Sequence, residues 1–210
     1  EFILLGHSLG GFVVSAWASR DDQQRIKCLG LLSPLLGWSD ARLEGTKEWA
    51  SSTWQRRAIS SVMESAWSNH ITPQAFVRWI PGAEGFFKRN AQRRFGRAKD
   101  MTDEECKMLA EYVVATMATP ASAEAAAAVC FEPFCKPVAI GGATIKQRLS
   151  QLKTPMFSIN GDHDWMEAAT SEEIPNCIFY TLKDSGHHLY FDNPEQLTEF
   201  VFGEVRKGNL

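Results

Sequence analysis

The chain has 210 residues, of which 44% are hydrophobic and 22% are charged, and its formal net charge is −3. This composition is typical of a folded protein with a substantial core, and it argues against a disordered chain and against a nucleic-acid partner. The five cysteines are odd in number and include no Cys-x-x-Cys pair, so we expect neither a disulfide framework nor a metal site. Nothing in the sequence indicates a cofactor. The longest apolar stretch, residues 123–131, is far too short to span a bilayer.

The first twenty residues carry a glycine–serine motif between a strand and a helix. Residues 1–5 are apolar after the first position and predict a buried strand, and residues 11–20 predict a helix. Between them stands the sequence Gly-His-Ser-Leu-Gly. This arrangement is typical of a nucleophile elbow, in which a strained turn raises a serine hydroxyl above the end of a sheet. The motif predicts Ser8 as a nucleophile.

Two further roles follow from the predicted elbow. The backbone N–H of Leu9 lies at the start of the helix, where it could stabilise an oxyanion with the help of the helix dipole. We expect Gly6 and Gly10 to let the strand and helix backbones approach each other without a Cβ clash. The alternative interpretation is a glycine-rich turn with no chemistry, which the apolar strand and helix on either side disfavour.

A second strand and a long helical region come next in the chain. Residues 26–32 form an apolar run typical of a buried parallel strand. Little strand-like sequence follows until about residue 145. Thr102 and the acidic residues after it resemble a capping box, and Pro73 suits the first position of a helix. Helices are expected over residues 46–67, 73–79, 84–95, 102–117 and 122–130.

Strand patterns return in the last third of the chain. Residues 154–160 and 177–182 predict strands, and a terminal helix is expected over residues 194–207. The order of elements predicts an α/β class fold, namely the C-terminal half of an α/β-hydrolase sheet interrupted by a helical cap. The expected domain limits are residues 1–36 for the first part of the core, 37–150 for the cap and 151–210 for the second part of the core.

The loops after the two later strands supply candidates for a catalytic acid and a base. In this fold the chain order is serine, acid, histidine, each at the carboxyl end of a strand. Asp164 is the preferred acid, because Asp162 is expected to cap the turn through its own backbone. His187 is preferred over His188, because the glycine before it allows a tight turn toward the serine. The sequence therefore predicts a catalytic triad of Ser8, Asp164 and His187.

Longer segments resemble one branch of the α/β-hydrolase family. The branch acts in lipid metabolism and includes a lipid-droplet lipase co-activator, lysophospholipases that act on N-acyl phosphatidylethanolamines, and plant relatives. The part of the resemblance in the expected cap is more specific than the elbow, which many unrelated hydrolases share. The segments are LGHSLGGF (5–12), LLSPLLGW (31–38), RFGRAKDMTDEECKMLAEYV (94–113), GDHDWM (161–166) and GHHLYFDNPEQ (186–196).

The same branch is associated with a histidine and an aspartate separated by four residues, a pattern taken as a mark of lysophosphatidic acid acyltransferase activity. His187 and Asp192 fit this pattern. The competing interpretation is an ordinary helix start, with Asp192 or Asn193 as the cap and Pro194 in the first turn.

Basic and aromatic residues in the expected cap offer contacts to a lipid. Tryptophans in its first half could anchor at an interface or line an acyl tunnel, but packing within the cap explains them equally well. The basic residues suit a phosphate head group or an anionic membrane surface, and a solvated helix face is the alternative. This basic cluster comprises Lys88, Arg89, Arg93, Arg94 and Arg97, followed by Lys99.

The triad and the resemblance together predict a serine acyl hydrolase for lipid esters such as lysophospholipids or acylglycerols, or an acyltransferase that uses the same serine. Two alternatives are a non-enzymatic lipase co-activator or lipid-surface scaffold, and a soluble esterase or serine peptidase of the same fold. Some co-activators of the branch lack the serine, so Ser8 favours an enzyme. We expect a cytoplasmic location, with peripheral contact to membranes or lipid droplets.

The chain begins with Glu1, inside an expected strand. The fold requires further strands before the elbow strand and a second oxyanion N–H from an earlier loop. We therefore expect the N-terminal strands and any targeting signal to lie outside this chain. On its own the chain is predicted to be inactive and poorly soluble, because an oxyanion donor is missing and a sheet edge is exposed.

Overall fold

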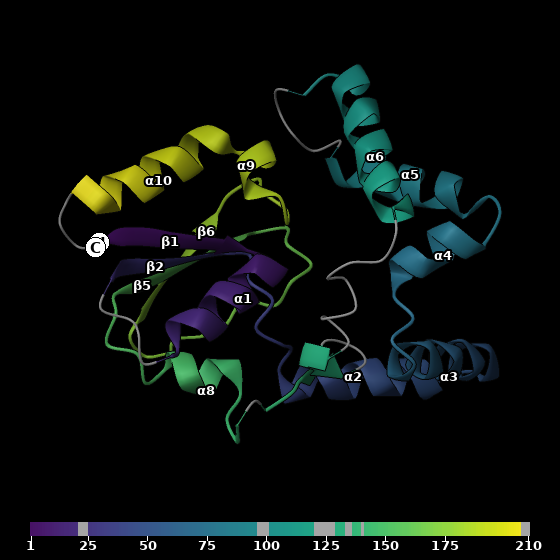
Figure 1. The fold of residues 1–210 in the computed structure, drawn as a ribbon, viewed down its shortest axis with the longest axis horizontal. Helices are drawn as coiled ribbons and strands as arrows, with labels where there is room; N and C mark the ends of the chain where they lie inside the picture. Colours follow the sequence, from purple (N-terminus) through teal and green to yellow (C-terminus); the bar gives the residue numbers. More distant parts are fainter. Residues whose placement is uncertain (21–24, 96–100, 120–128, 133–135, 140, 207–210) are drawn as a thin grey trace. The chain divides into compact units, whose positions relative to one another are not determined.

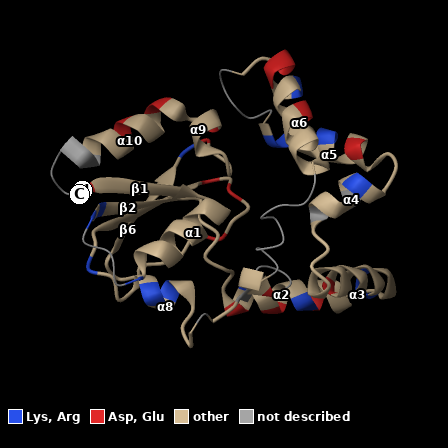
Figure 2. Ribbon diagram, viewed as in Figure 1, with Lys and Arg blue, Asp and Glu red and all other residues tan. Residues whose placement is uncertain are grey.

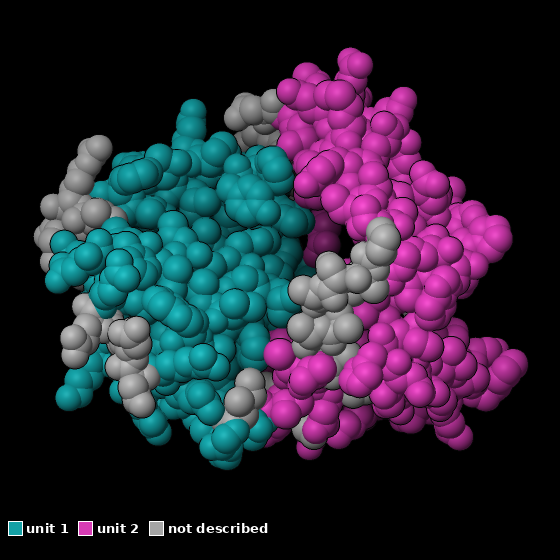
Figure 3. All heavy atoms as spheres, viewed as in Figure 1, with its two compact units in different colours: residues 1–36, 97–100, 139–210 teal, residues 37–96, 101–138 magenta. Residues whose placement is uncertain are grey.

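The computed structural model describes residues 1–20, 25–95, 101–119, 129–132, 136–139 and 141–206 (Figure 1). The chain divides into two compact units, shown in different colours in Figure 3. Unit 1 comprises residues 1–36, 97–100 and 139–210, and unit 2 comprises residues 37–96 and 101–138. Residues 139–150, which the predicted limits place in the cap, therefore group with unit 1.

Unit 1 is built on a parallel sheet, as predicted. Its strands are β1 (Phe2–His7), β2 (Ile26–Leu32), β5 (Met156–Gly161) and β6 (Cys177–Leu182), in the order β1-β2-β5-β6. Every residue of β5 is buried, as is every residue of β2 except Lys27, which explains their nearly continuous apolar sequences. The predicted bounds of β2 and β6 are confirmed, whereas β1 extends two residues further than expected, to His7.

The register of the sheet brings four strand ends to one edge. His7 pairs with Leu32 in β2, Leu32 pairs with Ile159 in β5, and Gly161 pairs with Leu182 in β6. Because all four strands are parallel, the loops that follow them emerge together at the carboxyl edge of the sheet. Such an edge is where open α/β sheets bind ligands.

Helices cover both faces of this sheet (Figure 1). They are α1 (Leu9–Ala18) and α8 (Ile145–Leu149) on one face and α10 (Pro194–Arg206) on the other, with the single turn α9 (Leu189–Asp192) before α10. Residues of the sheet and of α9 and α10 form one buried cluster: Cys28, Leu32, Phe157, Ile159, Leu182, Leu189 and Leu197. Ile145 and Leu149 are also buried, which explains why residues 139–150 belong with unit 1.

The described part of unit 2 is mainly helical. Its helices are α2 (Asp40–Ser51), α3 (Trp54–Ser68), α4 (Pro73–Trp79), α5 (Ala83–Phe95) and α6 (Asp103–Ala118). The single helix predicted over residues 46–67 is wrong, because α2 ends at Ser51 and the hydroxyl of Thr53 caps the start of α3 by accepting a hydrogen bond from the N–H of Arg56. The predicted capping box of α6 is confirmed at Thr102 and Glu105.

Two short strands occur in the region where little strand was expected. They are β3 (Phe131–Glu132) and β4 (Lys136–Pro137), which pair antiparallel. The indole N–H of Trp67 donates to the backbone oxygen of Phe131 at 2.8 Å, which ties α3 to β3. Most of the predicted helix over residues 122–130, and Cys135, lie outside the described residues. Within the described part of the chain, no helix has the length and apolar character needed to cross a membrane.

Candidate active site

The residue at the elbow has a strained backbone. Ser8 has φ 54° and ψ −122°, a conformation that residues other than glycine rarely adopt. Its N–H donates to the carbonyl of Leu32 at 3.0 Å, and its own carbonyl accepts from Gly11 and Leu35, both at 2.9 Å. The end of β2 and the start of α1 therefore hold the serine in this conformation. Leu9 is the first residue of α1, so its N–H lies in the turn where intrahelical partners are lacking.

Close backbone approach at the elbow requires two glycines, but one of them differs from the prediction. A Cβ on Gly6 would lie 2.4 Å from Cγ2 of Val14, and a Cβ on Gly11 would lie 2.7 Å from Cβ of Pro34. A Cβ on Gly10 would meet nothing within 4 Å among the described residues. The expectation for Gly6 is confirmed, whereas the second close contact is at Gly11 and not at Gly10.

The three predicted triad residues form a continuous hydrogen-bonded chain. Nε2 of His187 lies 2.9 Å from Oγ of Ser8, and Nδ1 of His187 lies 3.0 Å from Oδ1 of Asp164. The side chains of His187 and Asp164 are only 4% and 1% exposed. All three residues belong to unit 1 and follow β1, β5 and β6. This arrangement can pass a proton from the serine to the imidazole while the carboxylate holds the imidazole in place.

The environment of Asp164 keeps it ionised although it is buried. Burial alone would raise the pKa of this carboxyl. Interactions with His187, with the hydroxyl of Ser33 and with the N–H of Met166 outweigh burial and lower the pKa below its usual value. The N–H of Met166 donates to Oδ1 at 2.9 Å. Among the described residues, neither Oγ of Ser33 nor Oδ2 of Asp164 forms a hydrogen bond of regular geometry.

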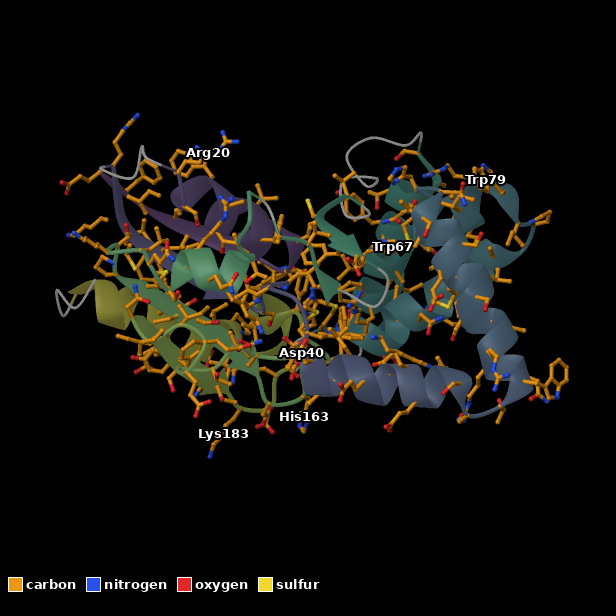
Figure 4. The ribbon with its side chains drawn as sticks, turned by 90° about the horizontal axis from the view of Figure 1, so that it is seen from below. Arg20, Asp40, Trp67, Trp79, His163 and Lys183 are labelled. Atoms are coloured by element: carbon orange, nitrogen blue, oxygen red, sulfur yellow. The ribbon has the colours of Figure 1, made fainter. Side chains whose placement is uncertain are left out.

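The competing acid, Asp162, has a structural role across two loops. Its carboxylate accepts the N–H groups of Ser185 at 3.0 Å and of Asp184 at 3.1 Å. These hydrogen bonds, the one from Ser185 first, lower the pKa of Asp162. A hydrogen bond from its own backbone also contributes, as predicted, but the stronger bonds of Asp162 join the loop after β5 to the loop after β6. His163 lies at the outer edge of unit 1, with its side chain 57% exposed (Figure 4).

The described residues include one group of side chains with metal-ligand chemistry. Asp162, His163 and Asp184 have ligand atoms within 4.8 Å of one another, and all three are exposed. The carboxylate of Asp162 already accepts two backbone N–H groups. Exposed polar groups of this kind are common without a metal, so they indicate no metal centre.

Asp192, the aspartate of the predicted acyltransferase pattern, is buried beside the loop after β6 that carries His187. Asp192 is 2% exposed, and its Oδ2 accepts the N–H of Gly186 at 2.7 Å. It does not cap α10, since Oδ1 of Asn193 accepts the N–H of Gln196 there. Gly186 has no positive φ, and its N–H donates to the Asp192 carboxylate. A Cβ on Gly186 would lie 3.3 Å from Oδ2 of Asp192, so the glycine allows this close approach.

A model of the alpha/beta hydrolase fold matches residues 1–194. The chain belongs to this family. The 1-acylglycerol-3-phosphate O-acyltransferase of Arabidopsis thaliana is 32% identical over 220 residues, which cover 99% of this chain and 50% of the plant protein. The (lyso)-N-acylphosphatidylethanolamine lipase of Bos taurus is 27% identical over 208 residues, which cover 92% of this chain and 55% of the bovine protein. The chain thus spans about half the length of the curated relatives it matches.

Solved structures support the α/β-hydrolase fold. The bromoperoxidase of Bacillus anthracis is similar with a TM-score of 0.61 and 19% sequence identity, over 97% of this chain and 67% of that protein. At this identity the likeness concerns the fold alone. The predicted fold class and the resemblance to the lipid-metabolism branch are both confirmed by these matches.

The described residues of the basic cluster of this α/β-hydrolase, Lys88, Arg89, Arg93 and Arg94, lie on α5 of unit 2, and part of their charge is paired. Nζ of Lys88 contacts Oε1 of Glu111 on α6, and this ion pair lowers the pKa of Glu111. Figure 2 colours the basic residues of α5 blue and the acidic residues of α6 red. Arg89, Arg93 and Arg94 are exposed, whereas Arg97 and Lys99 lie outside the described residues.

The tryptophans of unit 2 differ in their surroundings. Trp67 is partly buried and bonded to β3, and Trp38 packs under the guanidinium of Arg42 at 4.5 Å. Trp49, Trp54 and Trp79 are more than half exposed. The guanidinium of Arg56 lies 4.9 Å from the ring of Trp49, so packing within the unit accounts for part of Trp49 as well as for Trp38 and Trp67.

Sequence reasoning missed two residues next to the triad. Ser33 directly follows β2, at the same sheet edge as Asp164, and its hydroxyl acts on that carboxylate. The ring of Trp165 lies 5.1 Å from the ring of His187. The position of Ser33 at the end of a buried strand was a usable signal, and so was the position of Trp165 directly after the predicted acid Asp164.

Proposed function

We propose that the protein is a serine acyl hydrolase that acts on lipid esters, with lysophospholipids and acylglycerols as its substrate class. The observation that carries this proposal is the hydrogen-bonded series from Ser8 through His187 to Asp164, at 2.9 and 3.0 Å. A serine nucleophile supports acyl transfer chemistry, because the alkoxide attacks a carbonyl carbon and forms an acyl-enzyme.

The geometry supports the following sequence of steps. Oγ of Ser8 attacks the ester carbonyl while Nε2 of His187 takes its proton, and Asp164 stabilises the resulting imidazolium. The N–H of Leu9 donates to the oxyanion of the tetrahedral intermediate. The imidazolium then protonates the leaving alcohol, and an acyl group remains on Ser8. Water, activated by the same imidazole, attacks the acyl-enzyme and releases the fatty acid.

The lipid substrate class is supported by the two relatives described above, whose names concern glycerolipids and N-acyl phospholipids. The plant relative also favours a second candidate function, acyl transfer to a lysophosphatidic acid. The two reactions share every step up to the acyl-enzyme and differ only in whether water or the hydroxyl of a lysophospholipid attacks it. We propose that both use Ser8. Contact with a membrane or lipid-droplet surface would supply such substrates, and the exposed arginines of α5 are the proposed contact.

The test compares the protein, in its complete natural form, with its Ser8→Ala variant. Fatty acid release from lysophosphatidylcholine, from a triacylglycerol and from a short-chain ester is measured for both. The proposal expects turnover of the lipid esters by the natural protein and a loss of at least about 10³-fold in the variant. Equal turnover by both proteins, or turnover of the short-chain ester alone, would contradict it. A transfer assay with an acyl donor and lysophosphatidic acid measures the second candidate function.

A further inference from the structure

We infer that Asp192 and His7 are positioning residues that hold the backbone of the loop at Gly186 and at His187, and that Asp192 is not the acid of a separate acyltransferase centre. This inference rests on the proposed function, because it concerns how the same triad is held. Its two observations are hydrogen bonds to the backbone of this loop: Asp192 accepts the N–H of Gly186, the residue before His187, and His7 donates to the carbonyl oxygen of His187.

The first hydrogen bond explains the spacing between His187 and Asp192. The chain leaves His187 and forms the single helical turn α9, in which the N–H of Asp192 donates to the carbonyl of His188 at 3.0 Å. This turn brings the side chain of Asp192 back to the start of the loop, where Oδ2 accepts the N–H of Gly186 at 2.7 Å. Four intervening residues are thus the length that lets one helical turn close this loop. The buried Leu189 anchors the turn in the core.

The second hydrogen bond links the base to the strand of the nucleophile. Nε2 of His7 donates to the backbone oxygen of His187 at 2.8 Å, which identifies the Nε2–H tautomer of His7. His7 is the last residue of β1 and directly precedes Ser8. Its ring packs 4.8 Å from that of His187 and edge-on to that of Tyr190 at 5.2 Å. The backbone that carries the imidazole is therefore tied to the residue next to the nucleophile.

Both ring nitrogens of His187 already have partners, so neither is available to Asp192. One ring nitrogen of His187 faces Ser8 and the other faces Asp164. A carboxylate that polarised this histidine for a second reaction would need one of the same two nitrogens. Asp192 instead binds a backbone N–H that precedes the histidine. Hydrolysis and acyl transfer must then use one histidine, with Asp164 as its acid in both.

The experiment compares Asp192→Asn with Asp192→Ala in the complete natural protein. The amide oxygen of Asn still accepts the Gly186 N–H but carries no charge, whereas Ala removes the acceptor. We measure kcat and KM for lysophospholipid hydrolysis, the rate of acyl transfer, and the labelling rate of Ser8 by a fluorophosphonate. We expect the Asn variant to keep each rate within about threefold, and the Ala variant to lose up to about 10²-fold in kcat with little change in KM. Both reactions should fall by the same factor.

A matched pair tests His7, and a neighbouring acid serves as the control. His7→Gln retains an N–H donor and should keep more activity than His7→Phe, which keeps the ring without the donor. Glu195 is an exposed acid three residues after Asp192, and Glu195→Ala should leave every rate unchanged.

Several results would overturn the inference. They are an Asn variant that loses acyl transfer but keeps hydrolysis, an Asn variant as impaired as the Ala variant, or an Ala variant with unchanged kcat. If Asp192→Ala does not fold, the Asp192→Asn variant and the two His7 variants still give an answer. They show whether Asp192 acts as a hydrogen-bond acceptor for the Gly186 N–H or as a charged catalytic acid. The fluorophosphonate reports activation of Ser8 whatever the natural substrate. A failure of the lipid assays alone would therefore refute the proposed function and leave the positioning test intact.

Discussion

The close passage of one loop over Gly161 makes Gly161→Ala a severe test of the active-site geometry. Gly161 is the last residue of β5 and lies under the loop that carries His187. A Cβ at this position would stand 2.1 Å from the carbonyl oxygen of Ser185 and 2.5 Å from that of Gly186. Both obstacles are backbone atoms, so no side-chain rotation can relieve the clash. The loop after β6 has to move.

The size of the displacement follows from these distances. Real Cβ atoms essentially never come closer than 3.0 Å to such a neighbour, so the Ser185 carbonyl must retreat by about 0.9 Å. Ser185 is also held by a hydrogen bond from the N–H of His163 at 2.9 Å, which the movement strains. Forced repacking of this kind costs about 1–3 kcal/mol. A shift of that size passed to His187 would break the 2.9 Å contact with Ser8, and a misplacement of about 1 Å can reduce a rate about 10²-fold.

The assay measures the free energy of unfolding by urea titration and kcat with a chromogenic ester. Gly203→Ala is the matched control, because Gly203 lies within α10 and its new Cβ would meet no described residue within 4 Å. We expect the control to keep kcat and to gain up to about 1 kcal/mol from helix propensity. The reasoning is refuted if Gly161→Ala matches the control in both stability and kcat.

Three further predictions concern stability and reactivity. Thr102→Ala removes the hydroxyl that caps α6 and should lower the free energy of unfolding by about 1 kcal/mol in a urea titration, whereas no change would mean that the cap is dispensable. Burial raises the pKa of Cys28 to about 11 and that of Cys177 to about 12, so iodoacetamide at pH 8 should label neither thiol until denaturant is added. The pKa of Asp164 is lowered from 3.8 by the folded state, so its carboxylate stabilises the fold above about pH 3.8 and this stability is lost as the pH falls through the lower folded value. In a series of urea titrations below pH 5, Asp164→Asn should therefore show a shallower loss of stability than the natural protein.

The sheet was predictable from the sequence because its two central strands, β2 and β5, are almost fully buried and its outer strands are also short apolar runs. Residues 26–32 and 177–182 were predicted with the observed bounds, and the elbow motif fixed the position of β1. Unit 2 was less predictable, because its helix boundaries depend on hydrogen bonds of single polar side chains. Thr53 separates α2 from α3 by capping the second helix, yet the surrounding sequence remains compatible with one continuous helix. The two-residue strands β3 and β4 are too short for any alternating pattern to reveal them.

The site was predictable where chain order determines it and unpredictable where a tertiary contact determines it. A serine, an acid and a histidine that each follow a strand could be chosen from the sequence, because parallel strands bring their carboxyl ends together. Other contacts depend on which loops meet in space. Examples are the effect of the Ser33 hydroxyl on the pKa of Asp164 and the hydrogen bond from the Gly186 N–H to Asp192. The same holds for Asp162, whose partners lie 22 and 23 residues further along the chain.

The insertion of unit 2 between β2 and β5 has a consequence for folding. These strands are neighbours in the sheet, yet more than 120 residues separate the end of one from the start of the other. Strand pairs β1–β2 and β5–β6 are each local and can form early, whereas the pairing of β2 with β5 has to wait until the whole insertion has been synthesised. Ser8 meets His187 only after that pairing, across 179 residues. Substitutions in residues 37–138 can therefore lower activity by reducing the yield of assembled enzyme, and titration of active sites would separate this effect from a change in chemistry.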